Sequence, residues 1–273
     1  MNVKKEIGRF LSEDVGRGDI TSSILTNKRI SAKIISRQTG IVAGIQFVKE
    51  IFLANGCYTK ITKKDGSSIK QNQTVLVVSG PARKILSCER TALNLLSRMS
   101  GIATQTSELV NKIKSINPKT DLYSTRKTAP GLRYFDKEAV VIGGGKKHRM
   151  TLEDMIMIKD NHIATEGSLV RLIQKAKKRK KTFEVEVDTL TDAVLAATLG
   201  VPIIMLDNFT PARIQKTVTT LKKLGLRNKV KLEASGGINS QNIKQFAKTG
   251  VDMISVGFIT NSVKAIDFSL EVK

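Results

Sequence analysis

The stretch VPIIMLDNFTPARI, residues 201–214, decides the fold. Its apolar residues 203–206 predict a short strand that is buried on both faces. The polar pair Asp207-Asn208 follows directly, and Thr210 can then cap a helix that has Pro211 at its first position. A buried strand, a polar turn and a capped helix, in this order, make one βα unit of a parallel sheet.

The same order of features recurs from about residue 120 to the C-terminus. Short apolar runs predict strands at residues 121–124, 155–158, 183–187, 203–206, 230–233 and 253–256. Helix signals lie between them: residues 189–192 fit a capping box, and Asn239 or Ser240 can cap a helix that stops at Gly250. We therefore expect an α/β fold built on an incomplete, open barrel of about six parallel strands, fewer than the eight of a closed barrel.

The first part of the chain has a different order of predicted strands and helices. Strands are predicted at residues 30–36 and 74–79, and helical spacing is found at residues 44–55 and 87–99. No βα repeat is present there. We expect an N-terminal α/β domain over residues 1–105 and a barrel domain over residues 106–273, whose last few residues can pack back on the N-terminal domain.

Composition narrows the class of protein. Hydrophobic residues make up 40% of the 273, which excludes a disordered chain. Cys57 and Cys88 are too few for a disulfide framework or a thiolate metal cluster. No apolar run approaches the length that spans a bilayer, and Glu6, Glu13 and Asp14 lie where a signal peptide needs apolar residues. These features predict a cytoplasmic protein without membrane contact.

The net charge of +22 raises the alternative of a nucleic-acid-binding protein. The densest basic run, residues 175–181, ends an amphipathic segment that starts at Leu169, so it is interpreted as the exposed C-terminal end of a helix. Aromatic residues are only 4% of the chain and Trp is absent, so platforms for base stacking are scarce. We therefore expect no nucleic-acid partner and favour a small, highly anionic substrate.

Functional side chains follow every predicted barrel strand. In chain order they are Thr125, Arg126 and Lys127, then Lys159, Glu186 and Asp207, then Ser235, Gly236 and Gly237, and finally Gly257. Because the carboxyl ends of barrel strands share one mouth, these side chains are expected to form a single site. Charged residues directly beside apolar runs often mark such sites.

A second cationic segment precedes the strand at residues 155–158. Three glycines, residues 143–145, are followed by Lys146, Lys147, His148 and Arg149. Glycine amides can approach an anion closely, and the surrounding cations should keep His148 neutral until an anion binds. Together with the late glycine turns, which can hold a phosphate, these residues suggest group transfer on a phosphorylated sugar, with carboxylates stabilising positive charge at the ribosyl carbon.

The chain resembles the quinolinate phosphoribosyltransferase family, also called nicotinate-nucleotide pyrophosphorylase (carboxylating). The resemblance rests on an ordered set of motifs over nearly the whole chain: residues 13–21, 89–94, 100–104, 125–133, 158–162, 184–188, 206–209 and 235–238. It implies a pentosyltransferase of NAD biosynthesis that converts quinolinate and phosphoribosyl pyrophosphate to nicotinate mononucleotide, pyrophosphate and CO₂. It also implies Mg²⁺ bound with the pyrophosphate, no redox cofactor, and a homodimer or hexamer whose N-terminal domain covers the partner's barrel mouth.

Residue roles follow from the resemblance by position. The quinolinate carboxylates would be held by Arg126, His148 and Arg149, with Thr125 beside them and Arg90 reaching in from the other subunit. Phosphoribosyl pyrophosphate would be held by Lys127, Lys159, Glu186 and Asp207, and its 5′-phosphate by Ser235, Gly236, Gly237 and Gly257. The two lysines could also contact the substrate carboxylates. Glu186 and Asp207 would bind the ribose hydroxyls with Mg²⁺ nearby and stabilise an oxocarbenium-like transition state, although no side chain is assigned as a direct metal ligand.

Two positions depart from the family pattern. Lys147 stands where many relatives have Asn, and Asn261 stands where many have His. Neither position carries an assigned role. A paralogue group associated with molybdenum transport shares the fold, but the intact segment Ile158-Lys-Asp-Asn-His162 favours the quinolinate branch.

Overall fold

The computed structural model describes residues 2–179 and 181–272. Contacts divide the chain into two compact units. Unit 1 comprises the residues up to Ser107, Tyr134–Gly144 and the residues from Ser262 onward, and unit 2 comprises Glu108–Arg133 and Gly145–Asn261. No described helix has the length and apolar character needed to cross a membrane.

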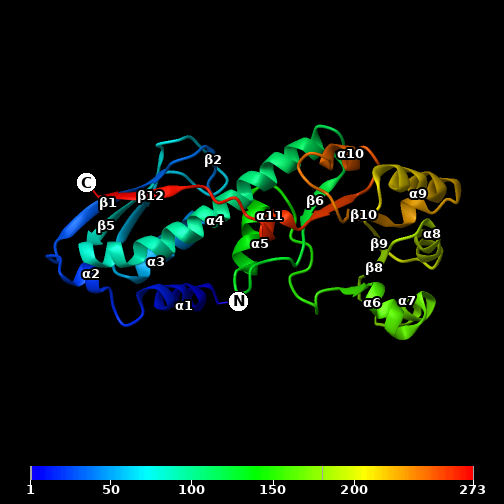
Figure 1. Cartoon of the computed structure of the whole chain (residues 1–273), viewed down its shortest axis with the longest axis horizontal. Coiled ribbons are helices and arrows are strands. Elements are labelled where there is room, and N and C mark those ends of the chain that lie inside the picture. The colour runs from blue at the N-terminus through cyan, green and yellow to red at the C-terminus, as the bar shows by residue number, and fades with distance from the viewer. Residues whose placement is uncertain (1, 180, 273) are drawn as a thin grey trace. The chain divides into compact units, whose positions relative to one another are not determined.

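Unit 1 is built on a four-stranded antiparallel sheet in the order β12-β1-β5-β3. These strands are β1 (Arg29–Ser36), β3 (Tyr58–Ile61), β5 (Thr74–Pro81) and β12 (Phe268–Val272), and a separate pair is formed by β2 (Gly40–Ile41) and β4 (Ser68–Ile69). The helices are α1 (Val3–Val15), α2 (Ile20–Ser23), α3 (Ile45–Ala54), most of α4 (Ala82–Lys114) and α5 (Arg133–Ile142). The C-terminal strand β12 runs antiparallel beside β1, so the last residues of the chain complete a sheet of the N-terminal part (Figure 1).

Helix α5 groups with unit 1, which a single boundary near residue 105 does not describe. Asp136 of α5 is fully buried, and both of its carboxylate oxygens accept hydrogen bonds from Arg98 of α4, at 2.7 and 2.9 Å. Its neighbour Phe135 packs edge-on against Phe47 with ring centroids 5.0 Å apart. An ion pair to a buried carboxylate and an aromatic contact therefore hold α5 among the unit 1 helices.

Unit 2 contains a six-stranded sheet in the order β6-β11-β10-β9-β8-β7, and every neighbouring pair is parallel. The strands are β6 (Asp121–Ser124), β7 (Ile156–Ile158), β8 (Phe183–Val187), β9 (Ile203–Asp207), β10 (Lys231–Ser235) and β11 (Met253–Val256). The connecting helices are α6 (Asp160–Glu166), α7 (Leu169–Lys178), α8 (Leu190–Thr198), α9 (Pro211–Lys223), the 3₁₀ turn η1 (Arg227–Lys229), α10 (Ile243–Ala247) and α11 (Phe258–Asn261). Strands β7 to β11 are neighbours in chain order, β6 pairs with β11, and the barrel stays open between β6 and β7. The predicted fold class is confirmed.

The segment between α5 and β7 passes beside the edge strand β6. Lys146 donates its amide to the carbonyl of Leu122 at 2.8 Å and accepts from the amide of Ser124 at 2.9 Å, so it adds one rung beside β6. The residues that follow it, His148 and Arg149, are therefore anchored at the open side of the sheet. The amides of Gly143 and Gly144 bond to carbonyls of α5. The expectation that these glycine amides hold an anion is wrong, because they close the helix.

Most predicted strands and caps are confirmed. Thr189 and Thr210 each accept a hydrogen bond at the start of α8 and α9, and Pro211 is the first residue of α9. The helix predicted to start at Asn239 or Ser240 begins only at Ile243, because the Asn239 side chain accepts the amides of Gln241 and Asn242 and forms a turn instead. The basic run forms the last turn of α7, and Lys180 within it lies outside the described residues.

The ion pair between Arg98 and Asp136 generates a stability prediction. Substitution of Arg98→Met keeps the aliphatic stem but leaves a buried carboxylate without its cation, so we expect the free energy of unfolding to fall by about 3–5 kcal/mol. Chemical denaturation measures this loss. The control is Glu271→Gln, which breaks the exposed pair with Arg37 and should change the same quantity by less than about 1 kcal/mol. Equal effects of the two substitutions would contradict the importance of the buried pair.

Candidate functional site

A cavity of about 570 Å³ opens at the carboxyl ends of the unit 2 strands. Eleven of the residues predicted from the sequence line it: Thr125, Arg126, Lys127, His148, Arg149, Lys159, Glu186, Asp207, Ser235, Gly236 and Gly237. Gly257 lies against two of them, because a Cβ added there would be 3.0 Å from Lys127 Cδ and 3.3 Å from Thr125 Oγ1. Parallel pairing therefore gathers residues that are up to 132 positions apart in the sequence, from Thr125 to Gly257, as the barrel argument predicts.

Arg90 lies apart from this group. It belongs to unit 1, where it lines a separate hollow of about 330 Å³ with residues that include Asp14 and Asp19. The carboxylate of Asp19 accepts hydrogen bonds from Ser22 and Ser87, and the Ser22 hydroxyl and amide lower the pKa of this carboxyl. The site within unit 2 is thus assembled without Arg90.

Two guanidinium groups give one part of the cavity its positive charge. Arg126 Nε is buried and has no hydrogen-bond partner among the described residues. The guanidinium of Arg149 donates to Met155 O at 3.4 Å and to Met157 Sδ at 3.1 Å. Burial and, after it, the nearby charge of Arg126 lower the pKa of Arg149. An anion bound between these two groups would satisfy Arg126 and relieve the repulsion between the cations.

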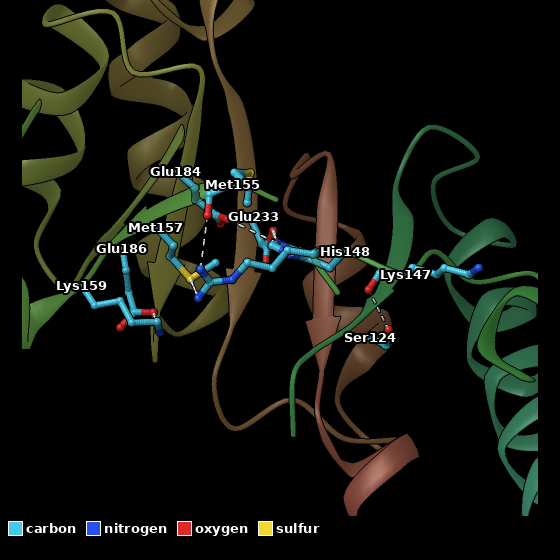
Figure 2. Close-up of polar contacts among 10 residues, drawn as sticks. Ser124, Lys147, His148, Met155, Met157, Lys159, Glu184, Glu186 and Glu233 are labelled. Carbon is cyan, nitrogen blue, oxygen red and sulfur yellow. Dashed lines mark hydrogen bonds and ion pairs between the residues drawn. The ribbon is translucent and has the colours of Figure 1, made fainter. Parts of the chain in front are cut away.

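Lys159 and Glu186 form a second charged pair in the cavity wall. Lys159 directly follows β7 and caps α6, where its backbone amide donates to His162 Nδ1 at 3.1 Å. Its ammonium group forms an ion pair with the carboxylate of Glu186 in β8, and Figure 2 shows the two side chains together. The capping contact fixes the start of α6, and the ion pair aligns the lysine with the neighbouring strand.

The loop after β10 fits closely against the end of β9. Gly236 has a φ angle of +89°, and a Cβ added there would lie 2.2 Å from Asn208 Oδ1 and 2.8 Å from its backbone nitrogen. Asn208 in turn donates from its side-chain amide to Asp207 Oδ2 at 2.7 Å and from its backbone to Ser235 O at 2.9 Å. Only glycine at position 236 permits this packing, which places Asp207 beside the Ser235–Gly237 loop.

His148 is the centre of a buried cluster that the sequence did not reveal. Its Nε2 lies 3.2 Å from Glu233 Oε2 and 3.3 Å from Glu184 Oε2, and both glutamates are fully buried. Burial favours a neutral imidazole, but the hydrogen bonds to Glu184 and Glu233 raise the pKa of His148 to about 9. Desolvation also raises the pKa of Glu184, to about 7. The expected surroundings of His148 are therefore wrong, because two carboxylates and not cations face its ring.

The sequence gives a clearer signal for Glu184 than for Glu233. Strand residues 183–187 alternate apolar and acidic side chains, a pattern that predicts a polar partner for Glu184, and His148 is that partner. Glu233 stands between Leu232 and Ala234 in β10, and its isolated charge within an apolar strand was the one available signal. Lys147, a departure from the family pattern, accepts a hydrogen bond from Ser124 Oγ through its carbonyl, and its side chain points away from the cluster in Figure 2.

The cavity therefore combines two kinds of binding surface. The arginine and lysine side chains that follow β6, precede β7 and follow β7 suit carboxylates or phosphates. Glu186 and Asp207 offer oxygen atoms to hydroxyl groups or a hard cation. The glycine loop at residues 235–237 leaves space beside Asp207, since a Cβ on Gly237 would meet nothing within 4 Å. One cavity can thus hold an anionic acceptor and a phosphorylated sugar side by side.

Comparisons with known proteins agree with this arrangement. A sequence model of the quinolinate phosphoribosyl transferase C-terminal domain matches residues 102–271, and that of the N-terminal domain matches residues 19–100. A probable nicotinate-nucleotide pyrophosphorylase [carboxylating] from Archaeoglobus fulgidus is 46% identical over 255 residues, covering 93% of this chain and 98% of the relative.

Solved structures agree over the whole chain. The nicotinate-nucleotide pyrophosphorylase from Ehrlichia chaffeensis superposes with a TM-score of 0.94 at 37% identity, covering 100% of this chain and 99% of that one. The enzyme of the same name from Francisella tularensis has a TM-score of 0.93 at 39% identity, covering 99% and 96%. The chain belongs to the quinolinate phosphoribosyl transferase family.

Proposed function

We propose that this chain transfers the phosphoribosyl group of phosphoribosyl pyrophosphate to quinolinate and removes one carboxyl group, giving nicotinate mononucleotide, pyrophosphate and CO₂. The observation that carries the proposal is the charge arrangement of the cavity, in which a buried, unpartnered Arg126 nitrogen and Arg149 share one space with Glu186 and Asp207. The relatives named nicotinate-nucleotide pyrophosphorylase [carboxylating] support the same reaction.

The cationic side chains would bind the acceptor. Quinolinate carries two carboxylates, and a guanidinium can hold a carboxylate through two parallel hydrogen bonds. Arg126 and Arg149 are therefore assigned to these carboxylates, with Thr125 beside them and Lys127 or Lys159 completing the charge balance. Both ring nitrogens of His148 already have partners within the protein, so its part in acceptor binding runs through the backbone that it shares with Arg149.

The opposite wall would bind the donor. The carboxylates of Glu186 and Asp207 can accept hydrogen bonds from the ribose hydroxyls and stabilise the positive charge that develops at C1′. Ser235, Gly236, Gly237 and Gly257 would hold the 5′-phosphate, because glycines let backbone amides approach an anion closely. Lys127 and Lys159 would hold the departing pyrophosphate.

The reaction needs no external electron acceptor. The quinolinate nitrogen attacks C1′ while the bond from C1′ to pyrophosphate breaks and its electron pair leaves with the pyrophosphate. The ring nitrogen is then cationic, so the adjacent C2 can keep the electron pair when its bond to the carboxyl group breaks and CO₂ departs. A proton from solvent then joins C2, and we propose no redox cofactor.

Magnesium is proposed as part of the donor substrate. Mg²⁺ prefers oxygen ligands and is commonly carried by phosphates together with bound water. The carboxylate oxygens of Glu186 and Asp207 line the cavity and fit such a cation beside the pyrophosphate. The ion would neutralise charge on the leaving group.

Assembly and location complete the proposal. A homodimer or hexamer would bring Arg90 and the N-terminal domain of one subunit over the barrel mouth of its partner. A cytoplasmic location agrees with Cys57 and Cys88, which are both buried and free, as is usual in a reducing compartment.

The acceptor and leaving-group assignments predict a large loss of activity in two variants. Arg149→Ala and Lys159→Ala should each lower kcat/KM by at least about two orders of magnitude, or roughly 3 kcal/mol, because each removes a charge that stabilises the transition state. The measurement is formation of nicotinate mononucleotide from quinolinate, phosphoribosyl pyrophosphate and Mg²⁺. Lys222→Ala removes an exposed cation of α9 that lies outside the cavity lining and serves as the control.

Three results would count against the proposal. Near-wild-type turnover in both variants would refute the assigned roles. A folded wild-type protein that binds phosphate but releases no CO₂ from quinolinate would indicate a repurposed paralogue. Tight binding of DNA or RNA with a steep salt dependence, unaffected by changes in the cavity, would favour the nucleic-acid alternative.

The Gly236 contact predicts a defect confined to the donor. Gly236→Ala should raise KM for phosphoribosyl pyrophosphate by about tenfold or more, since the new Cβ must displace Asn208 and with it Asp207. Gly225→Ala is the matched control, because Gly225 also has a positive φ, +69°, but a Cβ there meets nothing within 4 Å. Steady-state kinetics with each substrate varied in turn gives the two KM values. An unchanged KM for the donor in a folded Gly236→Ala protein would remove this loop from the donor site.

A further inference from the structure

We propose that Glu184 and Glu233 are positioning residues for acceptor binding: their buried carboxylates hold the His148 imidazole with its proton on Nε2, and this fixes the backbone that directs Arg149 into the cavity. The inference rests on the proposed function and deepens it by adding two buried residues that contact His148. The three side chains come from β8, β10 and the segment before β7, and Figure 2 shows them converging.

The cluster lies in a part of the molecule where charge must be balanced locally. Glu184 and Glu233 have no measurable exposure, and the side chain of His148 is only 7% exposed. Apart from the contact with His148, the oxygens of Glu184 and Oε1 of Glu233 have no hydrogen-bond partner among the described residues. Two such carboxylates, buried within 4.8 Å of each other and of the imidazole nitrogen, cannot both remain ionised without a compensating positive charge.

The other ring nitrogen decides where the protons lie. His148 Nδ1 accepts a hydrogen bond from the backbone amide of Arg149 at 2.8 Å, so a proton on Nδ1 would point at that amide hydrogen. The ring is therefore the Nε2–H tautomer and donates to the carboxylates. Because the three groups are in contact they hold protons jointly, and the raised pKa values of His148 and Glu184 mean that the cluster retains a proton which the separate groups would release.

The same contact argues against a metal ion in this cluster. One imidazole nitrogen and two carboxylates within 4.8 Å are a possible ligand set. A metal on Nε2 would require the imidazole hydrogen to be on Nδ1, where metal-bound histidines usually donate to an acceptor. Here Nδ1 faces a donor, the amide of Arg149.

The cluster acts on Arg149 through one peptide bond. His148 has a φ angle of +50°, which is unusual for a residue other than glycine and must be held by its surroundings. Two contacts of the ring hold it, Nδ1 with the Arg149 amide and Nε2 with the carboxylates. On the preceding side, Ser124 Oγ donates to Lys147 O at 3.1 Å. With the backbone fixed on both sides of His148, the side chain of Arg149 leaves the chain in one direction, toward Met157 and the cavity.

This arrangement predicts different effects for two substitutions of Glu233. Glu233→Gln keeps an oxygen acceptor for Nε2–H, whereas Glu233→Leu keeps the volume and removes the acceptor. We expect KM for quinolinate to rise by about tenfold or more in Glu233→Leu but to stay within about threefold of wild type in Glu233→Gln, with KM for phosphoribosyl pyrophosphate little changed in both. Glu184→Leu and Glu184→Gln should show the same division.

The ring itself provides a readout that is independent of activity. The chain has only two histidines, His148 and His162, so nitrogen-15 labelling of histidine gives two pairs of ring-nitrogen signals, and a His162→Gln variant assigns them. We expect the His148 ring to be the Nε2–H tautomer in the wild type and in Glu233→Gln, and to lose this single state in Glu233→Leu. Because the spectrum needs no turnover, it tests the cluster even if the proposed reaction is not found.

Three results would overturn the inference. The first is a His148 ring protonated on Nδ1 in the wild-type protein. The second is equal KM values for quinolinate in folded Glu233→Leu and Glu233→Gln proteins. The third is a transition metal in the purified wild-type protein, measured by elemental analysis at about one ion per chain and lost in Glu233→Gln, which would replace the shared proton by a cation.

Discussion

Parallel pairing of the six unit 2 strands is the constraint on which the remainder of the site depends. In a parallel sheet every strand points the same way, so each strand's last residues emerge at one edge. The register brings Glu186 of β8 and Glu233 of β10 against the same residue of β9, Met205, and aligns Ser235 with Asp207. Side chains with opposite charges thereby occupy one cavity without any of them being close in the sequence.

The open side of the barrel has a direct use. A closed barrel would place a strand between β6 and β7, whereas here an irregular segment pairs at one rung with β6 and then carries His148 and Arg149 inward. An irregular backbone can adopt the positive φ of His148, which a regular strand cannot. The absence of a strand between β6 and β7 thus allows the irregular backbone that directs the Arg149 guanidinium into the cavity.

Burial strengthens the interactions between the charged side chains in and around the cavity. Arg126 and Arg149 are crowded together, and the carboxylates of Glu184 and Glu233 lie behind them with His148. In water such groups would be screened from one another, but in a poorly solvated wall their interactions remain strong. The cost of holding like charges together is offset when a doubly negative ligand binds, which favours anions over neutral compounds of the same shape.

The strand positions, most helix starts and the residues at the strand ends were determined by the sequence alone, because apolar runs and caps such as Thr210-Pro211 act locally. Family motifs add roles for Lys159 and Glu186, and these roles stay predictions. Only the tertiary structure decided that α5 packs with unit 1, that two glycine amides end this helix, and that Glu233 meets His148 across the sheet. Those outcomes depend on contacts between residues far apart in the chain, and no local pattern records which buried charge will face which partner.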